Sequence, residues 1–253
     1  MTAAVQTATA PAPRTGGEPI LVVSDLRRRF GGITAANGVT LEIRRQEIVG
    51  LIGPNGSGKS TLFNLISGAL APDSGSVLFD GTEIAGWKAH RIARRGLART
   101  FQIPALFENM TVTENLLAAA AEGHWAGARE RAETTLAMLS LEPVRHNRAV
   151  DLSGGQQKLL EFGRIIMRQA SLILLDEVTA GVHLNIRRII LDAIARLRDE
   201  GATFFVIEHD MELVRNVCDR IVVMDAGQVI TTGTFDEIAR NSEVMQAYLG
   251  RRS

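Results

Sequence analysis

One nine-residue segment, from Gly53 to Thr61, limits what this chain can fold into more than any other feature. It reads GPNGSGKST and fits the pattern G-x-x-x-x-G-K-[ST]. The apolar run that ends at Ile52 is typical of a strand buried on both faces, and Leu62, Leu65 and Ile66 recur at helical spacing. A glycine-rich loop between such a strand and such a helix predicts an α/β domain with an anion-binding site at the loop.

The residue types in this loop suit a phosphate ligand. Glycine lets backbone N–H groups curl around an anion, and the start of the following helix adds free N–H donors. Lys59 can reach the β- and γ-phosphates of a nucleotide, and the Ser60 hydroxyl can bind Mg²⁺. The predicted nucleotide-binding residues of the loop are Gly53, Pro54, Asn55, Gly56, Ser57, Gly58, Lys59, Ser60 and Thr61. Kinases, GTPases and ATPases all use such a loop, so the pattern alone leaves the reaction open.

Strand and helix patterns alternate in the last third of the chain. We expect strands at 171–175, 203–207 and 220–224, and helices at 185–198 and 211–217. This alternation predicts a parallel sheet that is covered by helices on both faces.

The earlier part of the chain has a different pattern. Residues 1–19 are rich in Ala, Thr, Pro and Gly and are expected to be a disordered leader. Residues 113–169 are helical in pattern, and Thr113 is a candidate N-cap for the first helix. We therefore expect one domain, 20–250, with a helical subdomain at about 103–169 inserted in it.

Composition excludes several classes of protein. Lys plus Arg and Asp plus Glu are both 28, and a zero net charge argues against an electrostatically driven nucleic-acid binder. Cys218 is the single cysteine, so neither an internal disulfide nor a cysteine metal cluster can form. No apolar run approaches the 18 or more residues of a membrane span. A role at a membrane would therefore be performed from the aqueous side.

A second glycine-containing helix start follows the helical stretch. Leu152 to Gln157 reads LSGGQQ, and Ser153, Gly154, Gly155 and Gln156 could form a second anion-binding nest. Because one chain has little use for two such nests on one nucleotide, we expect this one to contact a nucleotide held by another copy. The alternative is a simple helix cap, in which Ser153 accepts a backbone N–H bond.

Polar residues end two of the predicted strands. Asp176 and Glu177 follow the run Leu172–Leu175, and His209 follows Phe204–Ile207 at the corresponding place. Asp176 is suited to Mg²⁺ coordination, Glu177 to general-base catalysis, and His209 to orienting a water or contacting a γ-phosphate. The alternatives are solvent-exposed acids and a structural histidine.

Together these motifs resemble the ATP-binding subunits of ABC transporters, from about residue 20 to 250. The resemblance identifies 53–60 as the Walker A loop, 152–156 as the signature, 172–176 as Walker B, Glu177 as the catalytic glutamate and His209 as the switch histidine. It implies a P-loop NTPase fold in the α/β class, with a mainly parallel central sheet, an N-terminal antiparallel β subdomain and a helical insertion.

The resemblance also assigns two further residues. Gln102 corresponds to the Q-loop glutamine, which binds Mg²⁺ and senses the γ-phosphate, and Phe30 to the aromatic that stacks on adenine. For Phe30 the alternative is ordinary core packing. The segments 29–32, 99–102, 106–107, 110–117, 208–211 and 247–250 are similar to those of ATPases of branched-chain amino-acid importers. Urea or amide importers and the lipopolysaccharide-export ATPase share much of this pattern.

Three positions depart from the family pattern. Val178 stands where proline is usual, His183 where Asp or Asn is commoner, and Leu184 where proline is frequent. Asp176 and Glu177 are intact, so hydrolysis is expected. The departures put in doubt how two sites would communicate, and a catalytically silent regulatory subunit remains an alternative.

The resemblance implies a mechanism and its partners. Two copies, or this chain and a similar ATPase, would bind ATP and Mg²⁺ head to tail at the cytoplasmic face of the membrane. Integral-membrane permease subunits would dock on 103–115 and the following helices, and a solute-binding protein would take part indirectly. A small-molecule kinase would not need LSGGQ, a GTPase would need the absent Asn-Lys-x-Asp motif, and 102–152 is too short for the coiled-coil arms of DNA-maintenance ABC proteins.

Overall fold

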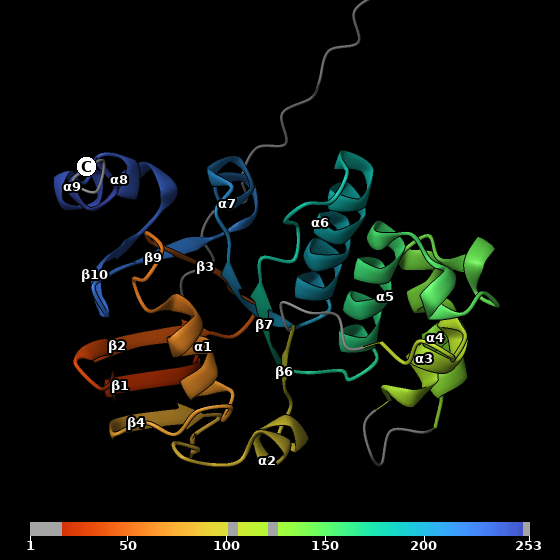
Figure 1. Ribbon diagram of the computed structural model, residues 1–253, viewed down its shortest axis with the longest axis horizontal. Helices are drawn as coiled ribbons and strands as arrows, with labels where there is room; N and C mark the ends of the chain where they lie inside the picture. Colours follow the sequence, from red (N-terminus) through yellow and green to blue (C-terminus); the bar gives the residue numbers. More distant parts are fainter. Residues whose placement is uncertain (1–16, 101–105, 121–125, 250–253) are drawn as a thin grey trace, which may run out of the picture.

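The computed structural model describes residues 17–100, 106–120 and 126–249. They form two sheets and a group of helices that lies apart from the antiparallel sheet (Figure 1). The strands are β1 Pro19–Phe30, β2 Ile33–Arg44, β3 Ile48–Ile52, β4 Ser74–Phe79, β5 Thr82–Glu83, β6 Leu97–Arg99, β7 Leu172–Asp176, β8 Thr203–Ile207, β9 Arg220–Asp225 and β10 Gln228–Gly233. The helices are α1 Lys59–Ile66, α2 Ala89–Arg94, α3 Val112–Ala118, α4 Ala128–Met138, α5 Gly154–Ile166, α6 Leu184–Asp199, α7 Met211–Val217, α8 Phe235–Ala239 and α9 Ser242–Leu249.

The central sheet has the strand order β10-β9-β3-β8-β7-β6 and is parallel except for β10. Every residue of β3, β7 and β8 is buried, as the apolar runs in the sequence predict. Because β7 and β8 pair in register, with Asp176 opposite Ile207, both strands end at the same edge of the sheet. The loops that follow them therefore begin side by side.

The N-terminal strands form a second, antiparallel sheet in the order β2-β1-β4-β5. Its apolar face shares one core with α1 and with one face of the central sheet, where the rings of Phe63 and Phe205 lie 5.0 Å apart. The expected fold class, a mainly parallel sheet with an antiparallel β subdomain, is confirmed.

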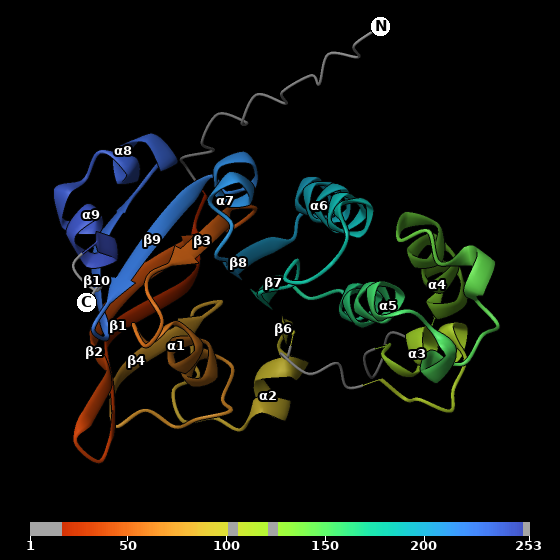
Figure 2. The same ribbon diagram turned by 45° about the horizontal axis from the view of Figure 1, so that its top comes forward.

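The helices α5 and α6 pack on the other face of the central sheet, and α3 and α4 pack against α5 (Figure 1). Along β7 the side chains alternate, so that Leu172 and Leu174 join the core of α1 while Ile173 and Leu175 join the core of α5 and α6. Gly163 of α5 lies so close to α3 and α4 that an added Cβ would be 2.9 Å from Leu116. The helices α1 and α5 thus lie on opposite faces of the sheet, as both ribbon views show (Figure 2).

The predicted cap of the first helix in the insertion is wrong by two residues. Thr111, rather than Thr113, caps α3: its Oγ1 accepts from the Glu114 N–H, and the Glu114 carboxylate accepts from the Thr111 N–H. Thr113 lies in the first turn, where its hydroxyl donates to the Arg145 carbonyl. The sequence contains a T-x-x-E capping box, Thr111 to Glu114, that begins two residues before the residue we chose.

The sequence patterns also missed several peripheral elements. Strand β10, the short strand β5 and the helices α2, α8 and α9 were not predicted. Most of the leader, residues 1–16, lies outside the described residues, and the division of the chain at 20 and about 103–169 stays a prediction. Among the helices that the structure describes, none is long and apolar enough to cross a membrane.

Candidate active site

The phosphate loop is packed too tightly to accept side chains at two of its glycines. Gly53 has a φ of 152°, and a Cβ there would lie 2.1 Å from the Met224 carbonyl oxygen. Gly58 has a φ of 105°, and its Cβ would lie 2.2 Å from the Ala35 oxygen. Both positions therefore require glycine, for conformation and for close approach to β9 and β2.

The loop leads directly into the N-terminus of α1. Gly58 is the N-cap and supplies no side-chain hydrogen bond, so the N–H groups of the first turn keep their capacity to bind an anion. Ser60 is exposed in this turn and Thr61 is half-buried. The predicted contact residues of the loop are thus brought together at one helix start.

Lys59 lies buried over the same loop. Its Nζ donates to the Gly53 carbonyl at 2.7 Å and to the Pro54 carbonyl at 3.1 Å. Burial lowers the pKa of Lys59, and the charges of Glu177 and Asp176 oppose that shift. The two acids at the end of β7 therefore favour the charged form of the lysine in the phosphate loop.

Asp176 is a buried carboxylate with one satisfied oxygen. Its Oδ2 lies 3.5 Å from the guanidinium of Arg99, and its backbone N–H donates to Thr100 Oγ1 at 2.8 Å. Burial raises the pKa of Asp176, which the charge of Arg99 partly offsets. Its Oδ1 is buried and has no hydrogen-bond partner among the described residues. An oxygen left in this way fits a site for a hard cation such as Mg²⁺.

Glu177 and His209 meet at the ends of the two neighbouring strands. Glu177 has a φ of 50°, uncommon for a residue other than glycine, and its N–H donates to the Ile207 carbonyl at 3.0 Å. Its Oε1 lies 2.9 Å from His209 Nε2. Both side chains are partly exposed, so a carboxylate and an imidazole are paired where solvent can reach them.

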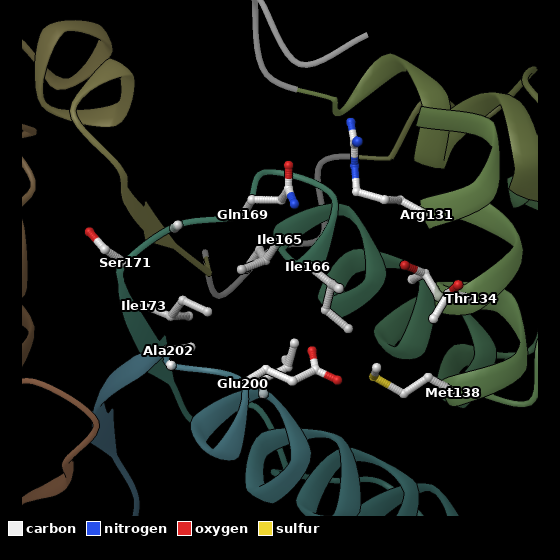
Figure 3. Close-up of a pocket in the computed structure, with 14 residues that line it drawn as sticks. Arg131, Thr134, Met138, Ile165, Ile166, Gln169, Ser171, Ile173, Glu200 and Ala202 are labelled. Atoms are coloured by element: carbon white, nitrogen blue, oxygen red, sulfur yellow. The ribbon is translucent and has the colours of Figure 1, made fainter. Parts of the chain in front are cut away.

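A hollow of about 220 Å³ adjoins these acids, lined by Asp176, Glu177, Thr100, Lys158 and Glu161 among others. Figure 3 shows a larger pocket, about 400 Å³, between α4, α5 and the C-terminal end of α6. Its labelled wall residues, such as Met138, Ile166 and Glu200, are none of those that the sequence predicts to act. We therefore place the candidate site at the strand ends rather than in that pocket.

The second glycine-containing helix start is capped within this chain. Ser153 Oγ accepts from the Gln156 N–H, and Gln156 Oε1 accepts from the Ser153 N–H at 3.0 Å. The cap that sequence reasoning kept as an alternative is therefore present. Around Gly154 the space is open, with no atom within 4 Å of an added Cβ. Because α5 and α1 lie on opposite faces of the sheet, this segment is separate from the phosphate loop of its own chain.

One of the two remaining predicted residues, Phe30, lies at the periphery. Phe30 is 45% exposed at the end of β1, with the Arg28 guanidinium 5.0 Å from its ring centroid. The core-packing alternative for Phe30 is therefore wrong. Gln102 lies outside the described residues.

Sequence reasoning did not find several residues that hold this site. Arg99, quoted only as part of a family segment, pairs with Asp176 and also donates to Asn64 of α1. Glu208 contacts Thr179. His183, which the sequence marked only as a departure from the family pattern, caps α6 by accepting from the Asn185 N–H at 3.4 Å. Their positions close to predicted site residues in the sequence indicated that they could contribute to the site. Which side chains they would contact cannot be predicted from sequence spacing.

Comparison with known proteins agrees with this geometry. The family model described as "ABC transporter" matches residues 36–180. The chain belongs to the ABC transporter family. It is an ATP-binding subunit of such a transporter and an ATP hydrolase.

The relatives of this ABC ATPase include two named amino-acid transport proteins. It is 40% identical to the high-affinity branched-chain amino acid transport ATP-binding protein BraF of Pseudomonas aeruginosa, over 92% of this chain and 98% of BraF. It is 39% identical to LivG of Escherichia coli, which carries the same description, with the same coverage.

Solved structures are similar over the same region. A nucleotide-free ATP-binding cassette from an ABC transporter matches with a TM-score of 0.82 and 32% identity, over 92% of this chain and all of that one. A dimeric cassette in a post-hydrolysis state with ADP and Pi matches with a TM-score of 0.74 and 27% identity, over 85% and 98%.

Proposed function

We propose that this ABC ATPase powers the import of branched-chain amino acids. The support is that BraF and LivG are both named as branched-chain amino acid transport ATP-binding proteins. The alignment to each covers 92% of this chain, at 39–40% identity. A cassette does not touch the cargo in this mechanism, so no residue of the site encodes the solute. The alternative functions are import of urea or amides and export of lipopolysaccharide.

The observation that carries the catalytic assignment is the 2.9 Å contact between Glu177 and His209. Glu177 acts as general base and removes a proton from the attacking water, while His209 holds that carboxylate in place and contacts the γ-phosphate side of the site. Lys59 supplies a positive charge to the β- and γ-phosphates. Gln102, from the Q-loop, senses the γ-phosphate.

Mg²⁺ fits the residues at this edge of the sheet. Asp176, with its unpartnered Oδ1, and Ser60, exposed in the first turn of α1, would hold the ion together with Gln102. When bound, Mg²⁺ neutralises charge on the phosphates. Residues 53–61 bind the triphosphate through the N–H groups of the loop and of the start of α1, and Phe30 stacks on the adenine.

The site is completed by a second subunit. The phosphate loop and residues 153–156 lie on opposite faces of one sheet, so a single chain cannot present both to one nucleotide. A head-to-tail pair, homodimeric or with a similar ATPase, brings Ser153, Gly154, Gly155 and Gln156 of one copy to the ATP of the other. The dimeric cassette with ADP and Pi supports this arrangement.

Membrane subunits dock beside the start of α3, at the cytoplasmic face of the membrane. Phe107, Met110 and Val150 are large exposed apolar residues there. Backbone bonds from Ala149 to the Met110 carbonyl and from Val150 to the Glu108 carbonyl hold the two segments together. Exposed apolar side chains that are held rigidly next to each other suit a protein interface.

Two experiments test this function. Glu177→Gln should bind ATP but lose about 10²–10⁴ in hydrolysis rate, whereas Lys59→Ala should weaken ATP binding itself. Hydrolysis by Glu177→Gln at the wild-type rate would remove Glu177 from the base role.

The transport assignment is tested by what co-purifies after mild detergent extraction. Two multi-span permeases that take up leucine in proteoliposomes support branched-chain amino-acid import, and uptake of urea or amides instead would replace that solute. A lipid-export complex would overturn import, and a chain with no membrane partner would overturn transport.

A further inference from the structure

Glu208 is a buried acid that the proposed reaction does not use. It is 4% exposed and follows β8, between Ile207 and His209. Among the described residues, Glu208 forms no ion pair. Two nearby side chains, Glu177 and Asp210, are acidic as well and so cannot compensate its charge. A buried carboxylate is costly unless it is paired or hydrogen-bonded, so the hydrogen bonds that Glu208 makes decide what it contributes.

The Glu208 carboxylate joins two loops. Its Oε1 accepts from the Thr179 backbone N–H at 3.3 Å and from the Thr179 hydroxyl at 3.1 Å. Thr179 is itself buried, two residues after Glu177. Both donors of one residue thus converge on one oxygen, which fixes the loop after β7 against the loop after β8.

This contact stands next to the pair that the proposed reaction needs. The Glu177 N–H is bonded to the Ile207 carbonyl, and Glu177 Oε1 is 2.9 Å from His209 Nε2. The Glu208–Thr179 contact therefore joins the same two loops as the Glu177–His209 pair. Glu208 directly precedes His209, and Thr179 is two residues after Glu177. Helix α7 does not depend on it, since Asp210 caps that helix and pairs with Arg187.

We propose that Glu208 is a positioning residue that holds Glu177 in register with His209. The proposal rests on the proposed role of Glu177 as the base. Glu177 sits at a φ of 50°, a conformation that persists only where surrounding contacts determine it. Without the acceptor at residue 208, the loop from Glu177 to Thr179 loses the contact that fixes its far end, and the carboxylate of Glu177 shifts from its place.

The first test compares two substitutions at the same position. Glu208→Gln keeps an oxygen that accepts from Thr179, and its kcat should stay within about twofold of wild type. Glu208→Leu removes the acceptor, and its kcat should fall at least about tenfold while the KM for ATP changes less than about twofold, because a small misplacement of a reacting group is costly. Thr179→Val, which keeps the N–H donor, should fall between the two.

Glu47→Leu is the matched control. Glu47 is also a buried glutamate, but it precedes β3 at the opposite end of the strands and pairs with Arg220 at 2.7 Å. This variant should lower the midpoint of thermal unfolding without lowering kcat. A kcat loss in Glu47→Leu equal to that of Glu208→Leu would mean that general destabilisation explains both, and would overturn the proposal.

A readout that does not depend on hydrolysis separates this role from a structural one. In the Glu177→Gln background, Glu208→Leu should still form an ATP-dependent dimer on gel filtration. Loss of that dimer, or a kcat for Glu208→Leu within about twofold of wild type, overturns the positioning role. Wild-type hydrolysis by Glu177→Gln alone would instead locate the failure in the proposed base.

Discussion

At the scale of single residues, the site depends on buried charges that compensate each other. Asp176 and Arg99 are almost completely buried, with side-chain exposures of 2% and 9%. Arg99 also donates to Asn64 Oδ1 at 2.6 Å and Ser67 Oγ at 3.1 Å, so it links β6 and β7 to the helix that begins at the phosphate loop. The arginine therefore contributes both charge and geometry.

Arg99→Met should lower the free energy of unfolding by about 3 kcal/mol, because it leaves the Asp176 carboxylate buried without its cation. Urea denaturation measures this loss. The control is Arg196→Met, which breaks an exposed pair with Glu200 and should cost less than about 1 kcal/mol. Adding Asp176→Asn to Arg99→Met should restore part of the stability, and equal losses in the two arginine variants would contradict the account.

Glu208 gives a prediction about pH. Burial raises the pKa of Glu208 above the ordinary value for glutamate, with the hydrogen bonds from Thr179 opposing the shift. In the window above that ordinary value, the folded state holds the proton more tightly than the unfolded state, so this group's contribution to stability falls as pH rises. Glu208→Gln should therefore gain stability relative to wild type from pH 4 to pH 7, measured by urea denaturation. A difference independent of pH would contradict the raised pKa.

At the scale of elements, the buried strands were predictable and the peripheral ones were not. The bounds of β8 and α7 match the sequence prediction, because uninterrupted apolar runs and clear helical spacing mark them. Strand β10 has no fully buried residue, and α8 is five residues long, so neither leaves a strong pattern. Helix α8 nevertheless carries a local signal that the spacing of apolar residues does not capture, the T-x-x-E capping box of Thr234 and Glu237.

The capping error also belongs to this scale and is testable. Thr111→Ala should destabilise the protein by about 1 kcal/mol, because it removes the acceptor for the Glu114 N–H at the start of α3. Thr113→Ala should cost less, since the Thr113 N–H still donates to the Arg145 carbonyl. Thermal or urea unfolding of both variants decides between them, and a larger loss in Thr113→Ala would restore the original cap.

The candidate site likewise has a part that the sequence could predict and a part that it could not. The phosphate loop, Asp176, Glu177 and His209 were predictable, because each follows a recognisable strand and the chemistry needs those residue types there. The contacts of Arg99 and Glu208 were not, because they join side chains from segments far apart in the chain. Whether Ser153 caps its own helix or binds a ligand also depends on geometry that no spacing reveals.

At the scale of the whole molecule, the sheet separates the two halves of the nucleotide site. The helix α1 packs on one face and α5 on the other, so the phosphate loop and the glycine-containing start of α5 cannot meet within one chain. The proposed completion of the site by a second copy therefore predicts that assembly depends on the nucleotide. The exposed Leu184, at the start of α6 after the capping residue His183, lies outside the apolar cores and is available to such a partner.

The mass of the Glu177→Gln chain in solution, measured by gel filtration with light scattering, tests the shared-site account most directly. Without nucleotide the account predicts a 27.4 kDa monomer, and with ATP and Mg²⁺ a species of twice that mass, because ATP joins the two surfaces and is not hydrolysed. The same experiment with Ser153→Glu, which places a negative charge against the phosphates, should leave the monomer. A mass that is unchanged by ATP in Glu177→Gln would contradict the account.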